Sequence, residues 1–115
     1  FQPLGMGDTF FNDGSSPEIA DRAWGYEATP SGWKKSDALM AIVGDGGLMT
    51  TARDLAKWDA NFYHNKLKIS DFTKKMCQPG RLRNGDLLDY GAGLDLLSVH
   101  GHTMIGHTGS YKGYR

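Results

Sequence analysis

The chain has 115 residues, the usual length of one domain, and 39% of them are hydrophobic, which is enough for a core. Its 13 Lys and Arg residues balance 13 Asp and Glu residues without a block of like charge, so the basic surface of a nucleic-acid binder is excluded. No apolar run approaches the roughly 20 residues that a membrane span needs, and the single Cys77 excludes an internal disulfide.

Residues 1–35 are aromatic, rich in glycine and without a helical period. Glycine and proline interrupt any helix here, so we predict an ordered loop with short strands. Large aromatic side chains would hold this loop in place, a role that we favour over the lining of a pocket, which the residues also permit. The aromatic residues concerned are Phe10, Phe11, Trp24, Tyr26 and Trp33.

A glycine-rich turn at residues 44–47 precedes the clearest helix, which we predict from residue 51 to about residue 63. Thr51 stands three residues before Asp54, in the pattern of a capping box. Apolar residues then recur on one helical face at Leu55, Trp58 and Phe62. The turn lacks the Gly-Lys-Ser/Thr of a phosphate-binding loop, so we interpret it as scaffold.

A second, shorter helix is predicted from a cap at Ser70 through Met76. Beyond Pro79-Gly80 the pattern changes to strands. This region contains, in order, an Asn84-Gly85 hairpin turn, a strand over residues 90–99, a turn at residues 100–102 and a second strand from Thr103. Helices followed by antiparallel strands predict an α+β fold. We expect a single partial domain over residues 1–115, with residues 1–79 loop and helical and residues 80–115 antiparallel strands.

The last predicted strand leads into His107-Thr108-Gly109, where chemically useful groups lie among glycines. His107 supplies an imidazole, Thr108 supplies a hydroxyl, and backbone N–H groups near Gly109 and Ser110 can face an oxyanion. The glycines let another backbone or a ligand approach closely. From the residues alone, a glycine-rich hairpin with an exposed histidine explains the pattern at least as well.

Four segments, PLGMGDTFF, GDGGLMTTARDLAKW, YGAGL and GHTGSYKGY, follow one another in the order and at the approximate spacing of one enzyme family. The chain resembles the serine β-lactamase-like family, in particular its class C β-lactamase, D-Ala-D-Ala carboxypeptidase and esterase branch. The resemblance implies a partial β-lactamase/transpeptidase-like fold. It also implies a Ser-x-x-Lys nucleophile, a Tyr-x-Asn element and a third element, Lys-Thr-Gly or His-x-Gly, on a sheet strand. Only the third stands in its expected place here, as His107-Thr108-Gly109.

By this resemblance His107 and Ser110 are the catalytic residues, and Thr108, Gly109 and Gly113 bind the substrate. His107 would orient the substrate and polarise the network of tyrosine and serine. Ser110 would lend its backbone N–H as one of two oxyanion donors, and removal of such a donor costs about 3 to 4 kcal/mol of barrier. Thr108 would touch the substrate carboxylate or amide, and the two glycines would keep the floor of the cleft bare.

Two partial matches to the missing elements are not assigned to catalysis. Ser31 and Lys34 have the Ser-x-x-Lys spacing but lie in a loop, and Tyr63-His64-Asn65 closes the predicted helix, where Asn is a common stop. In the family both elements precede the PLGM segment, with which this chain begins. We therefore expect a C-terminal-side fragment whose nucleophile and lysine lie outside this chain. It would be inactive alone and could self-associate through an exposed strand edge.

The expected function is that of a serine hydrolase acting through an acyl-enzyme on a small ester, amide or D-Ala-type peptide. The alternative is an inactive relative that binds peptide or peptidoglycan-like ligands. Histidine in place of lysine favours ester or peptide substrates over β-lactams, because histidine is only partly charged at neutral pH.

No cofactor, nucleic-acid partner or membrane span is expected. His100, His102 and His107 lie close in sequence, but no Cys or Glu stands nearby, so no metal site is predicted. The resemblance allows a periplasmic or extracellular location, which the residues themselves do not determine.

Overall fold

The computed structural model describes residues 1–13, 19–36, 43–44 and 46–114. The chain divides into two compact units, one formed by Phe1–Leu55 with Thr108–Arg115 and the other by Ala56–His107. The boundary falls within the first helix and directly after His107. The expectation of a single domain divided near residue 80 stays a prediction. In the described part of the chain, no helix is long and apolar enough to cross a membrane.

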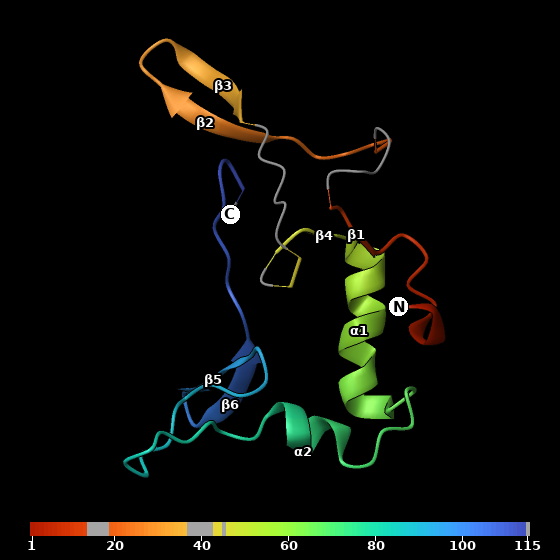
Figure 1. The fold of residues 1–115 in the computed structure, drawn as a ribbon, viewed down its shortest axis with the longest axis vertical. Coiled ribbons are helices and arrows are strands. Elements are labelled where there is room, and N and C mark those ends of the chain that lie inside the picture. Colours follow the sequence, from red (N-terminus) through yellow and green to blue (C-terminus); the bar gives the residue numbers. More distant parts are fainter. Residues whose placement is uncertain (14–18, 37–42, 45, 115) are drawn as a thin grey trace. The chain divides into compact units, whose positions relative to one another are not determined.

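The first unit contains a short 3-10 helix and two small antiparallel sheets (Figure 1). The 3-10 helix η1 spans Gln2–Leu4. Strand β1 (Phe10–Phe11) pairs with β4 (Leu48–Met49), and β2 (Gly25–Thr29) pairs with β3 (Gly32–Ser36). The apolar side chains of Leu4 and Met6 are buried. The prediction of ordered loop with short strands over residues 1–35 is therefore confirmed for the described residues.

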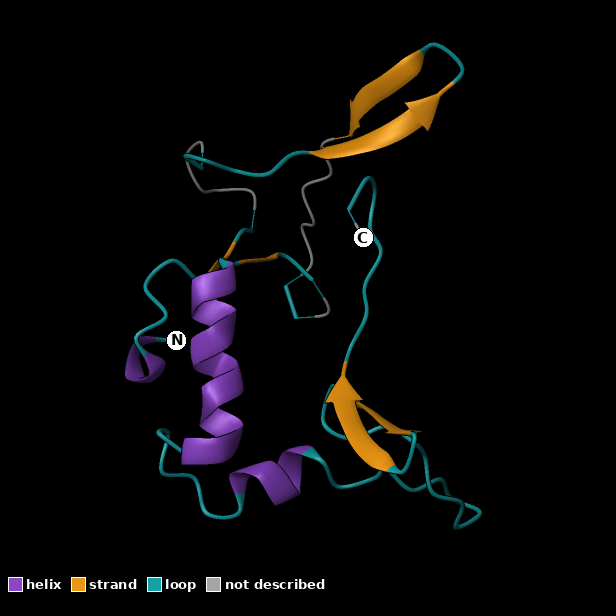
Figure 2. Ribbon diagram, turned by 180° about the vertical axis from the view of Figure 1, so that it is seen from behind, coloured by secondary structure: helices purple, strands orange, loops and turns teal. Residues whose placement is uncertain are grey.

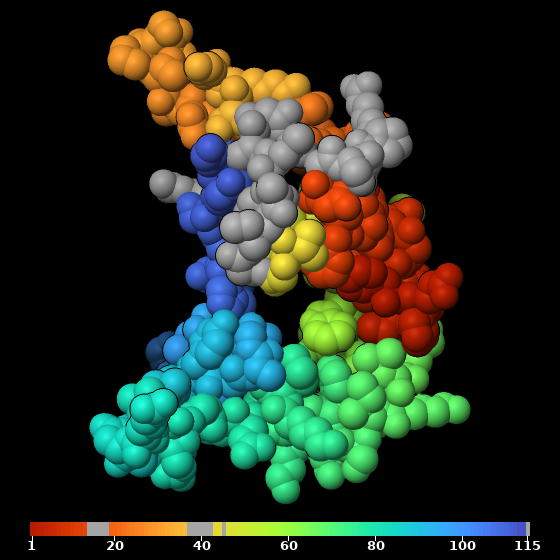
Figure 3. All heavy atoms as spheres, viewed as in Figure 1, coloured from red at the N-terminus to blue at the C-terminus, as the bar shows by residue number. Residues whose placement is uncertain are grey.

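The β2–β3 hairpin turns through Pro30 and Ser31, and its aromatic side chains are largely exposed. Trp33 is 75% exposed and Tyr26 is 49% exposed, and Figure 3 shows the hairpin as orange spheres. Trp24 is half-buried, with the Lys35 ammonium 3.0 Å from its ring centroid. Phe10 and Phe11 are exposed as well. The anchoring role is thus wrong for Tyr26 and Trp33, because no second layer of described residues covers the two-stranded hairpin. The ring of Phe11, on β1, contacts the ring of Phe1 with centroids 5.8 Å apart.

Helix α1 spans Ala52–His64, close to the predicted range. The Thr51 hydroxyl accepts the Asp54 N–H at 3.2 Å, and the Thr51 carbonyl accepts the Leu55 N–H, so Thr51 caps the helix as expected. The Asp54 carboxylate accepts the backbone N–H of Asp8 and the hydroxyl of Thr9, both at 2.8 Å. Asp54 therefore ties the N-terminal segment to the first turn of α1.

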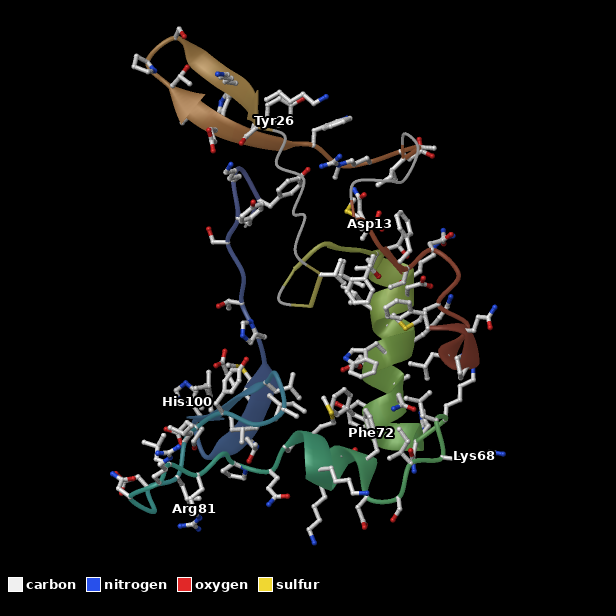
Figure 4. The ribbon with its side chains drawn as sticks, in the orientation of Figure 1. Asp13, Tyr26, Lys68, Phe72, Arg81 and His100 are labelled. Carbon is white, nitrogen blue, oxygen red and sulfur yellow. The ribbon has the colours of Figure 1, made fainter. Side chains whose placement is uncertain are left out.

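In the second unit, α2 (Phe72–Met76) packs its first residue against the apolar face of α1. The rings of Trp58, Phe62 and Phe72 contact one another edge to face, with centroids 5.2 to 5.8 Å apart. Figure 4 labels Phe72 at the start of α2. The expected cap at Ser70 is wrong, because Asp71 occupies the N-cap position in a left-handed conformation without a side-chain cap.

Strands β5 (Asp95–Val99) and β6 (His102–Gly106) form an antiparallel hairpin in the second unit (Figure 2). The turn is formed by His100 and Gly101, both with positive φ, so His102 belongs to the strand rather than to the turn. Strand β5 begins five residues later than predicted, because glycines make a tight turn over residues 91–94. The Asn84-Gly85 signal forms a turn closed by one isolated bridge, Arg81 to Leu87, rather than by two strands.

Candidate active site

The structure places the predicted site residues on one exposed stretch that follows β6. The stretch comprises His107, Thr108, Gly109 and Ser110. The resemblance put the His-Thr-Gly element on a strand, but β6 ends at Gly106. Gly106 pairs with Asp95, the first residue of β5, so β5 offers His107 no further ladder partner. The element therefore lies at the carboxyl end of β6, just beyond the sheet.

The imidazole of His107 contacts the ring of Tyr90. Their ring centroids are 5.8 Å apart at an interplanar angle of 74°, an edge-to-face arrangement. Tyr90 belongs to the YGAGL segment, which the sequence analysis treated as the start of a strand and as one of the four family segments, with no role in the site. No local signal links the two residues, because 17 positions separate them and the contact depends on how the strands pair.

Residues 111–114 form a tight turn that follows the site stretch. Tyr111 and Tyr114 exchange two backbone hydrogen bonds, at 3.1 and 2.8 Å, and Gly113 has a φ of 84°. This turn lies beside β2 in the first unit (Figure 1). The Tyr26 N–H donates to the Gly113 carbonyl at 3.3 Å, and the Tyr114 hydroxyl donates to the Ala23 carbonyl at 3.1 Å. Sequence reasoning did not predict this docking.

The two glycines expected in the floor of the cleft stand in different surroundings. A Cβ at Gly109 would meet no atom within 4 Å, so packing does not demand glycine there. A Cβ at Gly113 would lie 2.6 Å from the Tyr26 nitrogen and 2.9 Å from the carbonyl carbon of Gly25. The close approach of two backbones is therefore reason enough for a glycine at position 113.

Replacement of Gly113 by valine is expected to lower the free energy of unfolding by about 2 to 4 kcal/mol, since it combines a left-handed φ with a collision against β2. Amide exchange at Tyr26, whose N–H binds the Gly113 carbonyl, should become faster. Denaturant unfolding and hydrogen exchange measure the two effects. Gly109→Ala is the matched control and should change stability little. Equal stability of the two variants would contradict the docking of the turn.

Two other features of the chain contribute nothing to this site. His100 lies in the β5–β6 turn and His102 begins β6, and the described residues contain no group of three His, Cys, Asp or Glu side chains suited to a metal. A hollow of about 350 Å³ in the first unit is lined by residues 19–22 and Trp24, none of which is a predicted site residue.

The exposed stretch offers the groups that acyl transfer requires next to a nucleophile. An imidazole, a hydroxyl and backbone N–H groups stand on consecutive residues, where a substrate in solution can reach them. A model of the Beta-lactamase family matches residues 1–115. The chain belongs to the β-lactamase family. Its members include serine hydrolases of the penicillin-binding type, which agrees with the resemblance drawn from the four segments.

Two curated relatives support the same assignment. Penicillin-binding protein 4* of Bacillus subtilis is 29% identical over 99% of this chain. A D-aminopeptidase of Brucella anthropi is 26% identical over 88% of it. The chain spans only 28% and 20% of the lengths of these two proteins.

A solved structure bears out the fold. The octameric penicillin-binding protein homologue from Pyrococcus abyssi matches 95% of this chain with a TM-score of 0.75 and 26% identity. The match covers 26% of that chain, so the residues described here correspond to part of its fold. The predicted α+β, β-lactamase/transpeptidase-like class is therefore confirmed.

Proposed function

We propose that this chain forms the His-Thr-Gly wall of a serine hydrolase that acts through an acyl-enzyme on a small ester, amide or D-Ala-type peptide. The observation that carries the proposal is the exposed stretch of residues 107–110 at the end of β6, in a chain that matches the family model over its whole length. The nucleophilic serine and its lysine would come from outside these 115 residues.

In this proposal the serine oxygen bonds to the substrate carbonyl carbon, and the carbonyl oxygen takes the negative charge. The backbone N–H of Ser110 donates to that oxyanion, together with a second N–H at the nucleophile. The proton that the serine hydroxyl gives up to the lysine passes to the alcohol or amine, which leaves as its bond to the carbonyl carbon breaks and the carbonyl re-forms. Water then attacks the acyl-serine and releases the acid and the serine hydroxyl. His107 orients the substrate and polarises the hydroxyl groups around the nucleophile. Thr108 contacts the substrate carboxylate or amide.

The charge of the residue at position 107 and the names of the relatives restrict the class of substrate that we propose. A lysine at position 107 would present a fixed positive charge to an anionic substrate, whereas histidine is only partly charged at neutral pH. Esters, amides and peptides are therefore favoured over β-lactams. Among these three classes, the relative named D-aminopeptidase supports a peptide with D-residues as the substrate.

Self-association through a strand edge belongs to the same proposal. Among the described residues β6 pairs with β5 alone, and Leu97, Val99 and Met104 of this hairpin are exposed. A free edge of this kind can pair with another strand. The octameric state of the Pyrococcus abyssi homologue supports such contacts.

Labelling with a serine-reactive fluorophosphonate tests the proposed chemistry. The intact protein is expected to gain the mass of one adduct, and the 115-residue chain to gain none, because the proposed nucleophile lies outside it. Intact-mass spectrometry gives the readout, and heat-denatured protein is the control. A protein that stays unlabelled would favour the inactive, ligand-binding relative. Labelling of the short chain at a single serine would contradict the assignment of the nucleophile.

A further inference from the structure

The ring of Tyr90 is the described aromatic side chain that contacts the imidazole of His107. The contact is edge to face, with ring centroids 5.8 Å apart. Tyr90 is 38% exposed, so its ring lies at the surface beside the exposed His107 rather than in a core. A contact between two exposed rings adds little to the stability of the folded chain. It can, however, decide how a neighbouring ring is oriented.

Strand pairing brings the two residues together. Tyr90 forms an isolated bridge with Asp95, and Asp95 pairs in turn with Gly106. Tyr90 and Gly106 thus flank Asp95 on opposite sides, and His107 follows Gly106 directly. Gly106 has no side chain, and a Cβ there would meet no atom within 4 Å. This register leaves room for the two rings to meet at the end of β6.

The backbone around Tyr90 is held on both sides. The Tyr90 carbonyl accepts the Gly80 N–H at 2.8 Å, and the Gly91 N–H donates to the Leu94 carbonyl at 2.8 Å. The Ala92 N–H donates to the Met76 carbonyl at 3.0 Å. A side chain at Gly91 would collide with that same Met76 carbonyl, so the chain passes here at close range. The ring of Tyr90 therefore projects from a well-supported segment.

His107, by contrast, has left the strand. It lies beyond the last paired residue of β6, and β5 offers it no ladder partner. Catalysis needs the imidazole in one orientation. An edge-to-face contact favours one orientation over the others by a few-fold to about tenfold.

We propose that Tyr90 is a positioning residue that holds the His107 imidazole in the orientation used by the active site. The effect of this contact on catalysis rests on the proposed function. The contact itself is tested by a measurement that does not depend on enzyme activity. The ring, rather than the phenolic hydroxyl, makes the contact. Phenylalanine at position 90 is therefore expected to preserve the contact, and leucine is expected to abolish it.

The test compares Tyr90→Phe, Tyr90→Leu and the control Tyr63→Leu, which removes a tyrosine that is 77% exposed in the same unit. Proton resonances of the His107 ring, assigned with His107→Ala, report the ring current of Tyr90. They are expected to move in Tyr90→Leu and to stay nearly in place in Tyr90→Phe and Tyr63→Leu. Circular dichroism confirms that each variant is folded.

In steady-state hydrolysis of a short-chain ester by the intact protein, Tyr90→Leu should lower kcat about 3- to 10-fold with a smaller change in KM. Tyr90→Phe should retain the wild-type kcat. Unmoved His107 resonances or an unchanged kcat in Tyr90→Leu would overturn the inference, as would a Tyr90→Phe variant that behaves like Tyr90→Leu. An inactive wild type whose resonances respond as expected would refute the proposed function and still support the orienting contact.

Discussion

Substitution of Asp54 by alanine is expected to lower the free energy of unfolding by about 2 to 4 kcal/mol. The Asp54 side chain is fully buried and accepts hydrogen bonds from the Asp8 N–H and the Thr9 hydroxyl. Its loss leaves these donors without their acceptor, and each buried unsatisfied group costs about 1 to 3 kcal/mol. The Thr9 hydroxyl also lies 2.8 Å from the Thr50 hydroxyl, an alternative acceptor, which keeps the total below the sum of two full penalties.

Denaturant unfolding of the intact protein measures this effect. Asp59→Ala is the matched control, because Asp59 is an exposed carboxylate on the same helix and its loss should change stability by no more than about 0.5 kcal/mol. Asp54→Asn keeps one acceptor oxygen, so its free energy of unfolding should lie between those of the two alanine variants. If Asp54→Ala and Asp59→Ala unfolded at the same denaturant concentration, the network that ties the N-terminal segment to α1 would carry no net energy.

The second large effect is expected in activity. His107→Ala in the intact protein should lower kcat/KM for a short-chain ester about 10²- to 10³-fold, within the range found when a positioned polar or acid–base group is removed. His107 is exposed, so the free energy of unfolding should stay nearly unchanged. Steady-state kinetics and denaturant unfolding separate the two quantities. His102→Ala, an exposed histidine on β6, is the control and should retain activity.

A second substitution at the same position tests the substrate preference. His107→Lys introduces a permanent charge, which should raise the ratio of β-lactam to ester turnover by about tenfold. Wild-type activity in the His107→Ala variant would contradict a role for His107 in catalysis. A wild-type protein that already hydrolyses cephalosporins faster than esters would refute the preference drawn from histidine.

Local signals predicted α1 closely and located the turn of the last hairpin, although β5 is shorter than predicted. The Thr51 cap and the spacing of Trp58 and Phe62 define α1, because capping and a helical period act within a few residues. The α+β class and the family followed from element order and from four short segments. The predicted cap at Ser70 was wrong for an equally local reason, since Asp71 takes the N-cap position in a left-handed conformation that the pattern does not show.

The sequence by itself determined the family and the fold class, because both depend on residue types and spacing along the chain. Only the tertiary structure decided that the His-Thr-Gly element lies beyond β6, that Gly113 passes against β2 and that Tyr90 meets His107. Those facts depend on strand register and on contacts between residues far apart in sequence. Register is set by the pairing of whole strands, which no single stretch of the chain encodes.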